Sequence, residues 1–128
     1  MTSAVLDASA VLALVRDEPG GDKVAQHVGR ATISAVNLQE VVKDLMLSGL
    51  DHLVIRELLA ELRLDVRAHD ADAAYAAAAL HEHTKRYGRG PGDRSCMALA
   101  IALGVPAVTA DREWRKVEVD GLRLEHLR

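Results

Sequence analysis

Short apolar runs alternate with longer segments of helical periodicity along this chain of 128 residues. The runs are bounded by turn-forming or charged residues and have the length of buried strands. They predict four strands, over Ser3–Leu6, Ala31–Ser34, Leu64–Arg67 and Pro106–Thr109, with a candidate fifth strand at an edge over Leu122–Leu124.

Helical patterns fill the intervals between these runs. Apolar residues at i, i+3, i+4 and i+7 predict helices that begin near Ala8, near Leu38 and after Asp51, which is a suitable N-cap. Further helices are expected over 22–28, 70–87 and 93–103, with a loop over 88–92. The seven alanines between Ala71 and Leu80 predict a buried helix face.

Strands separated by helices favour right-handed crossovers and a parallel sheet that is covered on both faces. We therefore expect one α/β domain over residues 1–128, with helices in two layers around a short-stranded, mostly parallel sheet. Ligands of such folds bind beyond the carboxyl ends of the strands, so this edge is the place to look for a site.

Composition excludes several classes of protein. Apolar residues make up 49% of the chain, yet Phe is absent and aromatic residues are only 2%, which argues against an RNA binder that stacks bases on aromatic side chains. Cys96 is the only cysteine, so neither an internal disulfide nor a cysteine zinc site can form. With no basic leader and no long apolar run, we expect a cytoplasmic protein without a membrane segment.

The charge is small but unevenly distributed. A net charge of −3 argues against a general nucleic-acid binder. Residues 84–128 hold nine basic and six acidic residues, a local +3, whereas residues 1–83 hold seven and thirteen, a local −6. An anionic partner is therefore expected to meet the C-terminal third of the chain.

Four carboxylates are expected at the carboxyl edge of the sheet. Asp7 follows the first strand, Asp111 follows the fourth, Glu40 lies one turn into a helix, and Asp93 opens another helix. Converging carboxylates repel one another unless a cation binds between them. Oxygen ligands without His or Cys favour Mg²⁺, with Mn²⁺ as a substitute.

Each of these residues also has a purely structural interpretation. Asp7 and Asp93 both precede helical segments and are suitable N-caps. Glu40 is suited to a solvated helix flank and could pair with Lys43, and Asp111 could be a turn residue. The hypothesis of a metal site therefore depends on their joint placement.

Neighbouring polar residues could support the carboxylates or contact a substrate. Ser9, Asn37 and Thr109 are candidate supporting residues, although each is equally suited to a helix start, a cap or a strand. Arg94 and Arg112 could bind phosphate groups in bidentate fashion, with solvated surface charge as the alternative.

Four segments in register resemble the PIN-domain ribonucleases, in particular the VapC-type toxins of toxin–antitoxin pairs. The matching segments are Val5–Ala10, Ile33–Val41, Gly92–Ala100 and Val108–Trp114, and the resemblance covers essentially the whole chain. It implies that Asp7, Glu40, Asp93 and Asp111 are the catalytic and metal-binding acids of a Mg²⁺-dependent endoribonuclease that hydrolyses RNA phosphodiester bonds.

The resemblance also implies partners. VapC-type toxins are homodimers, and an antitoxin neutralises them by laying a helix into an apolar groove. The predicted helices over 36–48 and 51–62 have more hydrophobic residues than one buried face needs, which suits such a groove, although a plain core is the alternative. These surplus residues are Met46, Leu47, Leu50 and Leu53.

Other functions predict different residues. A receiver-type phosphoacceptor domain expects an acidic pair after the first strand and a Lys after the fifth, and a dehalogenase-type phosphatase expects Asp-x-Asp where this chain has Asp7-Ala8-Ser9. A non-catalytic or housekeeping PIN-like module that binds or processes RNA is the nearest alternative.

Overall fold

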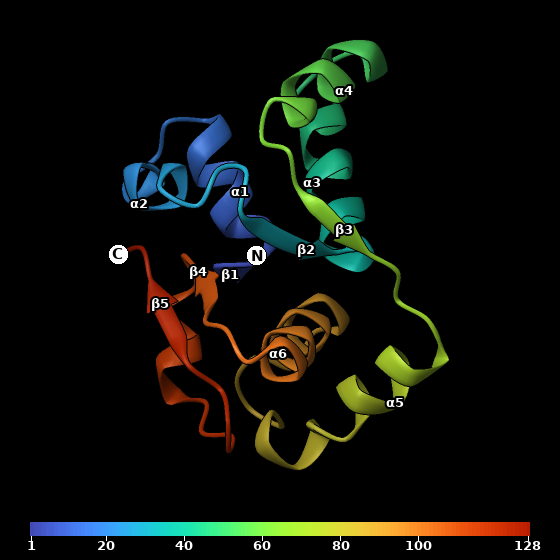
Figure 1. The fold of residues 1–128 in the computed structure, drawn as a ribbon, viewed down its shortest axis with the longest axis vertical. Helices are drawn as coiled ribbons and strands as arrows, with labels where there is room; N and C mark the ends of the chain where they lie inside the picture. Colours follow the sequence, from blue (N-terminus) through green and yellow to red (C-terminus); the bar gives the residue numbers. More distant parts are fainter.

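The computed structural model describes all 128 residues and contains one five-stranded parallel sheet between two layers of helices (Figure 1). The sheet order is β3-β2-β1-β4-β5, and every neighbouring pair is parallel. The strands are β1 (Ala4–Leu6), β2 (Ala31–Ser34), β3 (Asp65–Arg67), β4 (Ala107–Thr109) and β5 (Leu124–His126). The predicted three-layer α/β/α fold is confirmed, including the edge position of the fifth strand.

Burial explains which strands lie in the centre. All residues of β1, β2 and β4 are buried, as their continuous apolar or small side chains require when helices cover both faces. The edge strand β3 is exposed throughout, and its Asp65 and Arg67 place charges on an edge that would otherwise invite pairing with another chain. Since each strand has only three or four residues, the carboxyl ends of the central strands lie close together.

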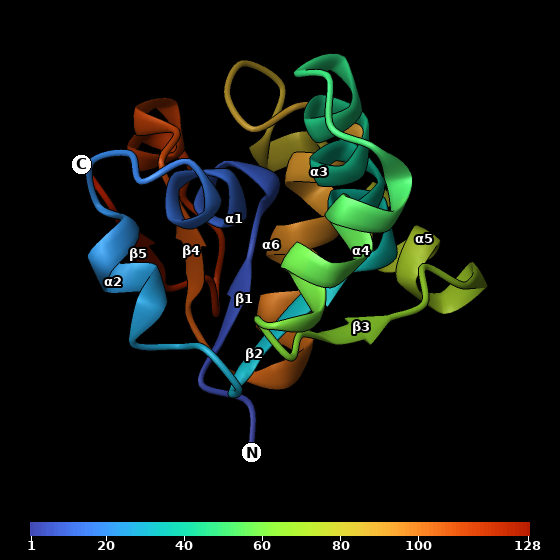
Figure 2. The ribbon, with the colours of Figure 1, turned by 90° about the horizontal axis from the view of Figure 1, so that it is seen from above.

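Six α-helices form the two outer layers (Figure 2). One layer holds α1 (Ala8–Val15), α2 (Gly21–Ala25), α3 (Ala35–Leu47) and α4 (His52–Ala60), and the other holds α5 (Ala71–Ala78) and α6 (Pro91–Leu103). Within β1, Ala4 and Leu6 pack into the first layer and Val5 into the second, as strand alternation dictates. None of the helices is long and apolar enough to cross a membrane.

The expected long helix over 70–87 is wrong. The helix α5 ends at Ala78, a 3₁₀ helix η1 (His81–His83) follows, and the chain then turns back toward α6. The turn buries Leu80 against α6, where the Thr84 hydroxyl donates a hydrogen bond to the Leu80 carbonyl oxygen at 2.8 Å. Tertiary packing here overrides the helical preference of the sequence.

The expected buried alanine face is also wrong. Of the seven alanines in this stretch only Ala77 is buried, because α5 touches the rest of the molecule along a single line of contact with α6. Elsewhere the helix boundaries shift by a few residues: α2 ends at Ala25 rather than Val28, and α6 begins at Pro91 rather than Asp93.

Candidate active site

Asp7 lies where β1 ends and α1 begins, so its backbone belongs to the sheet edge and its side chain to a helix start. It is the N-cap of α1, and its Oδ1 accepts the backbone N–H of Ala10 at 2.9 Å. This is the structural role that the sequence left open. It does not compete with a role in a site, because the carboxylate also lines the cleft described below.

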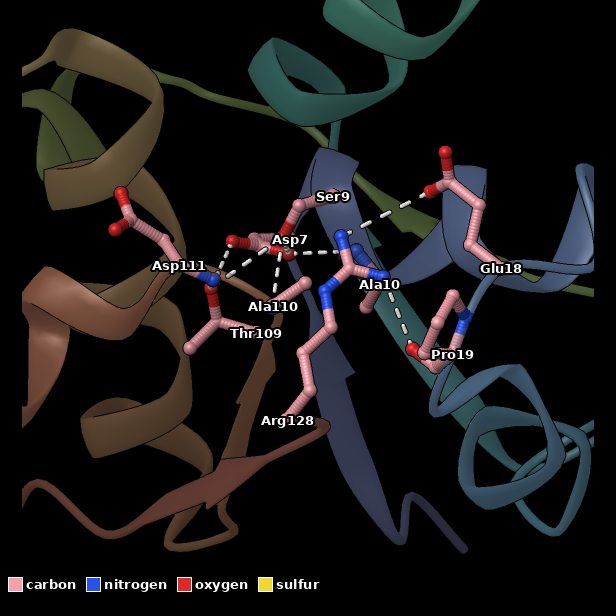
Figure 3. A network of polar contacts seen from close by, with 9 residues as sticks. All are labelled: Asp7, Ser9, Ala10, Glu18, Pro19, Thr109, Ala110, Asp111 and Arg128. Atoms are coloured by element: carbon pink, nitrogen blue, oxygen red, sulfur yellow. Dashed lines mark hydrogen bonds and ion pairs between the residues drawn. The ribbon is translucent and has the colours of Figure 1, made fainter.

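Two hydroxyl groups, one from α1 and one from β4, hold the Asp7 carboxylate (Figure 3). Thr109 Oγ1 donates to Asp7 Oδ2 at 2.6 Å, and Ser9 Oγ donates to Oδ1 at 2.7 Å. The same hydroxyls accept backbone N–H groups of the segment after β4: Thr109 accepts from Asp111 at 3.0 Å and Ser9 from Ala110 at 2.9 Å. The ends of β1 and β4 are thereby tied to each other through Asp7.

Burial raises the pKa of Asp7 to about 6, because desolvation disfavours its charged form. The hydrogen bonds from Thr109, Ser9 and Ala10 oppose this rise, and the negative charge of Asp93 adds to it. A buried carboxylate of this kind, with no basic side chain against it, is typical of a functional site.

Glu40 is held in place by Asn37, which lies one turn earlier on α3. Asn37 Nδ2 donates to Glu40 Oε1 at 2.9 Å and to the Gly92 carbonyl oxygen at 3.1 Å, so it links α3 to the first turn of α6. Desolvation raises the pKa of Glu40, against the effect of the Asn37 hydrogen bond, and the charge of Asp93 raises it further.

Gly92 is a functional position that the sequence analysis missed. A Cβ atom at this residue would collide with the carboxylate of Glu40, so only glycine leaves room for that carboxylate. The glycines on both sides of Pro91 were a signal of close approach, but sequence alone does not tell which group approaches.

Asp93 and Asp111 complete the set of four acids. Asp93 lies in the first turn of α6, and its Oδ2 accepts the Gly90 N–H at 3.1 Å. Desolvation raises the pKa of Asp93, the Gly90 hydrogen bond opposes this, and the charge of Asp111 adds to it. Asp111 precedes the 3₁₀ helix η2 (Arg112–Lys116), whose Glu113 N–H it caps at 2.9 Å.

All four acids line one open cleft of about 230 Å³ at the carboxyl edge of the sheet. The cleft has ten lining residues: Asp7, Ala8, Ser9, Leu12, Asn37, Glu40, Lys43, Asp44, Asp93 and Asp111. Sequence analysis did not assign Asp44 to the site, although it follows Glu40 by one helical turn and so shares its face of α3. Asp44 forms an ion pair with Lys43, whose Nζ lies 3.6 Å from Asp44 Oδ1.

The donors in this cleft fit a hard divalent cation by their chemistry. No group of three or more His, Cys, Asp or Glu side chains is arranged as a complete ligand set. The cleft nevertheless gathers carboxylate oxygens, and burial, with a smaller contribution from their mutual charge, raises the pKa values of Asp7, Glu40 and Asp93. Asn37 Oδ1 is buried beside them and has no hydrogen-bond partner. Oxygen donors of this type suit Mg²⁺ or Mn²⁺.

The two arginines expected near phosphate lie in different surroundings. Arg94 Nε donates to Thr84 Oγ1 at 2.8 Å, so this guanidinium braces the segment before α6. Arg112 is exposed at the start of η2, directly after Asp111, and has no carboxylate within ion-pair distance.

The model of the PIN domain matches residues 4–120. The chain belongs to the PIN-domain family. Members of this family are generally nucleases, and the match decides against the receiver-type and phosphatase alternatives.

This PIN domain is similar in fold to several solved toxin–antitoxin structures. The DNA-bound VapBC complex from Salmonella typhimurium aligns over 100% of both chains with 22% identity and a TM-score of 0.69. A toxin–antitoxin complex from Klebsiella pneumoniae aligns over 94% of this chain and 95% of its own, with 17% identity and a TM-score of 0.72. VapBC-5 from Mycobacterium tuberculosis aligns over 98% of this chain and 99% of its own, with 22% identity and a TM-score of 0.62. No curated protein sequence matches this chain.

Proposed function

We propose that this PIN domain is a metal-dependent endoribonuclease and the toxin of a toxin–antitoxin pair. The observation that carries the proposal is the gathering of Asp7, Glu40, Asp93 and Asp111 in one cleft from four separate parts of the chain. Membership of the PIN-domain family and the similarity in fold to VapBC complexes support it.

In this proposal Asp7, Asp93 and Asp111 hold Mg²⁺, for which Mn²⁺ can substitute. The bound ion would supply an activated water and neutralise charge at the scissile phosphate of RNA. Thr109 and Ser9 fix both oxygens of Asp7, so that carboxylate cannot rotate away from the cleft.

Glu40 would orient the attacking water. Asn37 occupies Glu40 Oε1, which leaves Oε2 free to accept a proton from water. The raised pKa of Glu40 brings this carboxylate closer to the basicity that a general base needs at neutral pH.

The partner in this proposal is an antitoxin that lays an apolar helix on α3 and α4. An open groove of about 480 Å³ runs between α3, α4 and β3, and its lining includes Leu38, Val42, Ile55 and Leu59. Beside it Leu47 and Leu53 are 78% and 67% exposed, which is unusual for leucine unless another surface covers it. From the family resemblance we also propose that the toxin is a homodimer.

Cleavage of total cellular RNA tests the proposed activity. The purified chain is incubated with Mg²⁺, with Mn²⁺ or with EDTA, beside the variant Asp7→Asn. We expect discrete RNA fragments in both metal lanes and none with EDTA or with the variant. A variant that cleaves normally with metal would contradict the assignment of the site, and a wild type that neither cleaves nor binds Mn²⁺ would favour a non-catalytic module.

A further inference from the structure

Two basic segments adjoin the acidic cleft without lining it. Residues 84–90 and the helix η2, which we call the basic wall, contain six cationic side chains and one acidic one. The cations are Lys85, Arg86, Arg89, Arg112, Arg115 and Lys116, and the acid is Glu113.

Each segment of the basic wall is joined to one of the site carboxylates. The N–H of Gly90, the residue after Arg89, binds Asp93 Oδ2 at 3.1 Å. Arg112 directly follows Asp111, which lines the cleft. Figure 2 shows the loop before α6 and the segment after β4 on the same edge of the sheet, the edge at which β1 ends. Arg89 and Arg112 therefore directly neighbour, in the chain, residues that bind or line the acidic site.

Contacts between its two segments give the basic wall a defined shape. Lys116 Nζ lies 4.7 Å from the centroid of the Tyr87 ring, a cation–π distance that joins the loop to η2. Trp114 is fully buried beneath them. On the other side, Arg94 binds Thr84 at the start of the loop.

Three of the six cations of the basic wall are free to bind an external anion. Arg86, Arg89 and Arg112 are exposed and have no carboxylate within 4.0 Å, whereas Lys85 pairs with Glu82. Of the residues that line the cleft itself, Lys43 on the α3 side is the only cation, and it pairs with Asp44. Phosphate groups would therefore be attracted to one side of the cleft and repelled by the other.

We propose that the sugar–phosphate chain of single-stranded RNA runs along the basic wall, with Arg89 and Arg112 on either side of the scissile phosphate and Arg86 on a neighbouring one. This inference rests on the proposed function and adds the path that the RNA takes from the cleft. That path leaves the apolar surface of α3 and α4 free for a protein partner. A single strand is favoured because the carboxylates lie in a recess of only about 230 Å³.

Salt-dependent binding tests the proposal without catalysis. The probe is a fluorescent oligouridine of about 12 nucleotides, titrated from about 50 to about 200 mM KCl in EDTA, which withholds the metal that the proposed cleavage needs. Each lost contact with a single-strand phosphate lowers the slope of log affinity against log salt by about 0.7. The triple variant Arg86→Gln, Arg89→Gln, Arg112→Gln should therefore lower this slope by about 2 and the affinity at least about tenfold.

A charge-matched triple variant is the control. Arg30→Gln, Arg56→Gln, Arg123→Gln removes three exposed arginines elsewhere and changes the net charge equally, so its slope should stay near that of the wild type. Equal slopes for the two triple variants, or no binding by the wild type at about 50 mM KCl, would overturn the proposal. So would tighter binding of polyglutamate than of RNA, since the basic wall would then be a contact for an acidic protein segment.

The outcome is separable from the proposed activity. A chain that binds the oligouridine through the basic wall but cleaves no RNA with Mn²⁺ would refute the nuclease and leave the binding surface in place. A chain that cleaves RNA but shows equal slopes for the two triple variants would keep the nuclease and refute the basic wall.

Discussion

Asp7 shows how one side chain can serve the fold and the site together. Its Oδ1 caps α1, and its two oxygens also accept hydroxyl groups from Ser9 and Thr109. These bonds stabilise the charged form, yet desolvation exceeds them and raises the pKa to about 6. The ionised carboxylate is therefore held in place at a net cost to the stability of the domain.

This cost predicts a pH-dependent effect of Asp7→Asn. Between about pH 4 and pH 6 the folded chain binds more protons at Asp7 than the unfolded chain, so the stability of the wild type falls as the pH rises through this range. At about pH 8, in EDTA, the variant should be more stable than the wild type by up to about 3 kcal/mol, and near pH 4 this gain should vanish. Urea unfolding at a series of pH values measures the difference, and a gain that does not change with pH would contradict the raised pKa.

Gly92 is the second residue with a sharp prediction. In Gly92→Ala the new methyl group must displace the Glu40 carboxylate, because the two cannot occupy the same space. A displacement of about 1 Å at a catalytic group costs on the order of 100-fold in rate, so RNA cleavage should fall by about that factor. Pro91→Ala, an exposed change at the neighbouring residue, should leave the rate within a few-fold of the wild type. The initial rate of cleavage compares the two variants, and equal rates would refute the role of Gly92.

At the scale of elements, the site depends on how α3 and α6 meet. Glu40 belongs to α3 and Asp93 to α6, and Asn37 spans the two helices through its bonds to Glu40 and to the Gly92 carbonyl oxygen. A buried amide therefore links the two helices that carry these carboxylates.

Asn37→Ala should loosen this junction. It leaves the Gly92 carbonyl oxygen without its Asn37 donor, which should lower the free energy of unfolding by about 1–3 kcal/mol. The variant also loses the hydrogen bond from Asn37 to Glu40 Oε1, which should weaken Mn²⁺ binding by about 10- to 100-fold. Gln39→Ala, on the exposed side of α3, is the matched control. Chemical denaturation and Mn²⁺ titration followed by electron paramagnetic resonance measure the two effects, and Mn²⁺ affinities that do not differ between the variants would argue against the support.

At the scale of the whole molecule, parallel pairing brings distant parts of the chain to one edge. The register of β1 with β4 places Leu6 beside Val108. The next residues, Asp7 after β1 and Thr109 at the end of β4, come into hydrogen-bond contact across about one hundred positions of sequence. The resulting collection of like charges is unfavourable to the folded state without a cation.

A divalent cation should therefore stabilise the entire domain. Mn²⁺ at about one hundred times its dissociation constant adds about 2.7 kcal/mol to the free energy of unfolding, which corresponds to a rise in Tm on the order of 10 °C. Asp93→Asn should abolish most of this rise, whereas Asp120→Asn, at an exposed position away from the cleft, should preserve it. Differential scanning calorimetry measures both, and an equal rise in the two variants would locate the cation elsewhere.

Much of the architecture was determined by local pattern. The apolar runs predict the five strands to within two or three residues, and the alternation of strands with helices predicts the parallel sheet. The position of Asp7 and Asp111 after their strands follows from chain order alone, because parallel strands end at one edge. The prediction failed over 70–87, where alanine favours helix but the burial of Leu80 against α6 ends it.

Only the tertiary structure decided which groups touch. The sequence named Asn37, Ser9 and Thr109 as supporting residues without saying which carboxylate each would hold, and it gave no sign that Gly92 must leave space for Glu40. Hydrophobic periodicity indicates which face of a helix or strand is buried, and it depends only on residues that are close in sequence. A hydrogen bond or a collision depends on ångström-scale distances between segments that lie far apart in the chain, and these distances are fixed only when the helices pack on the sheet.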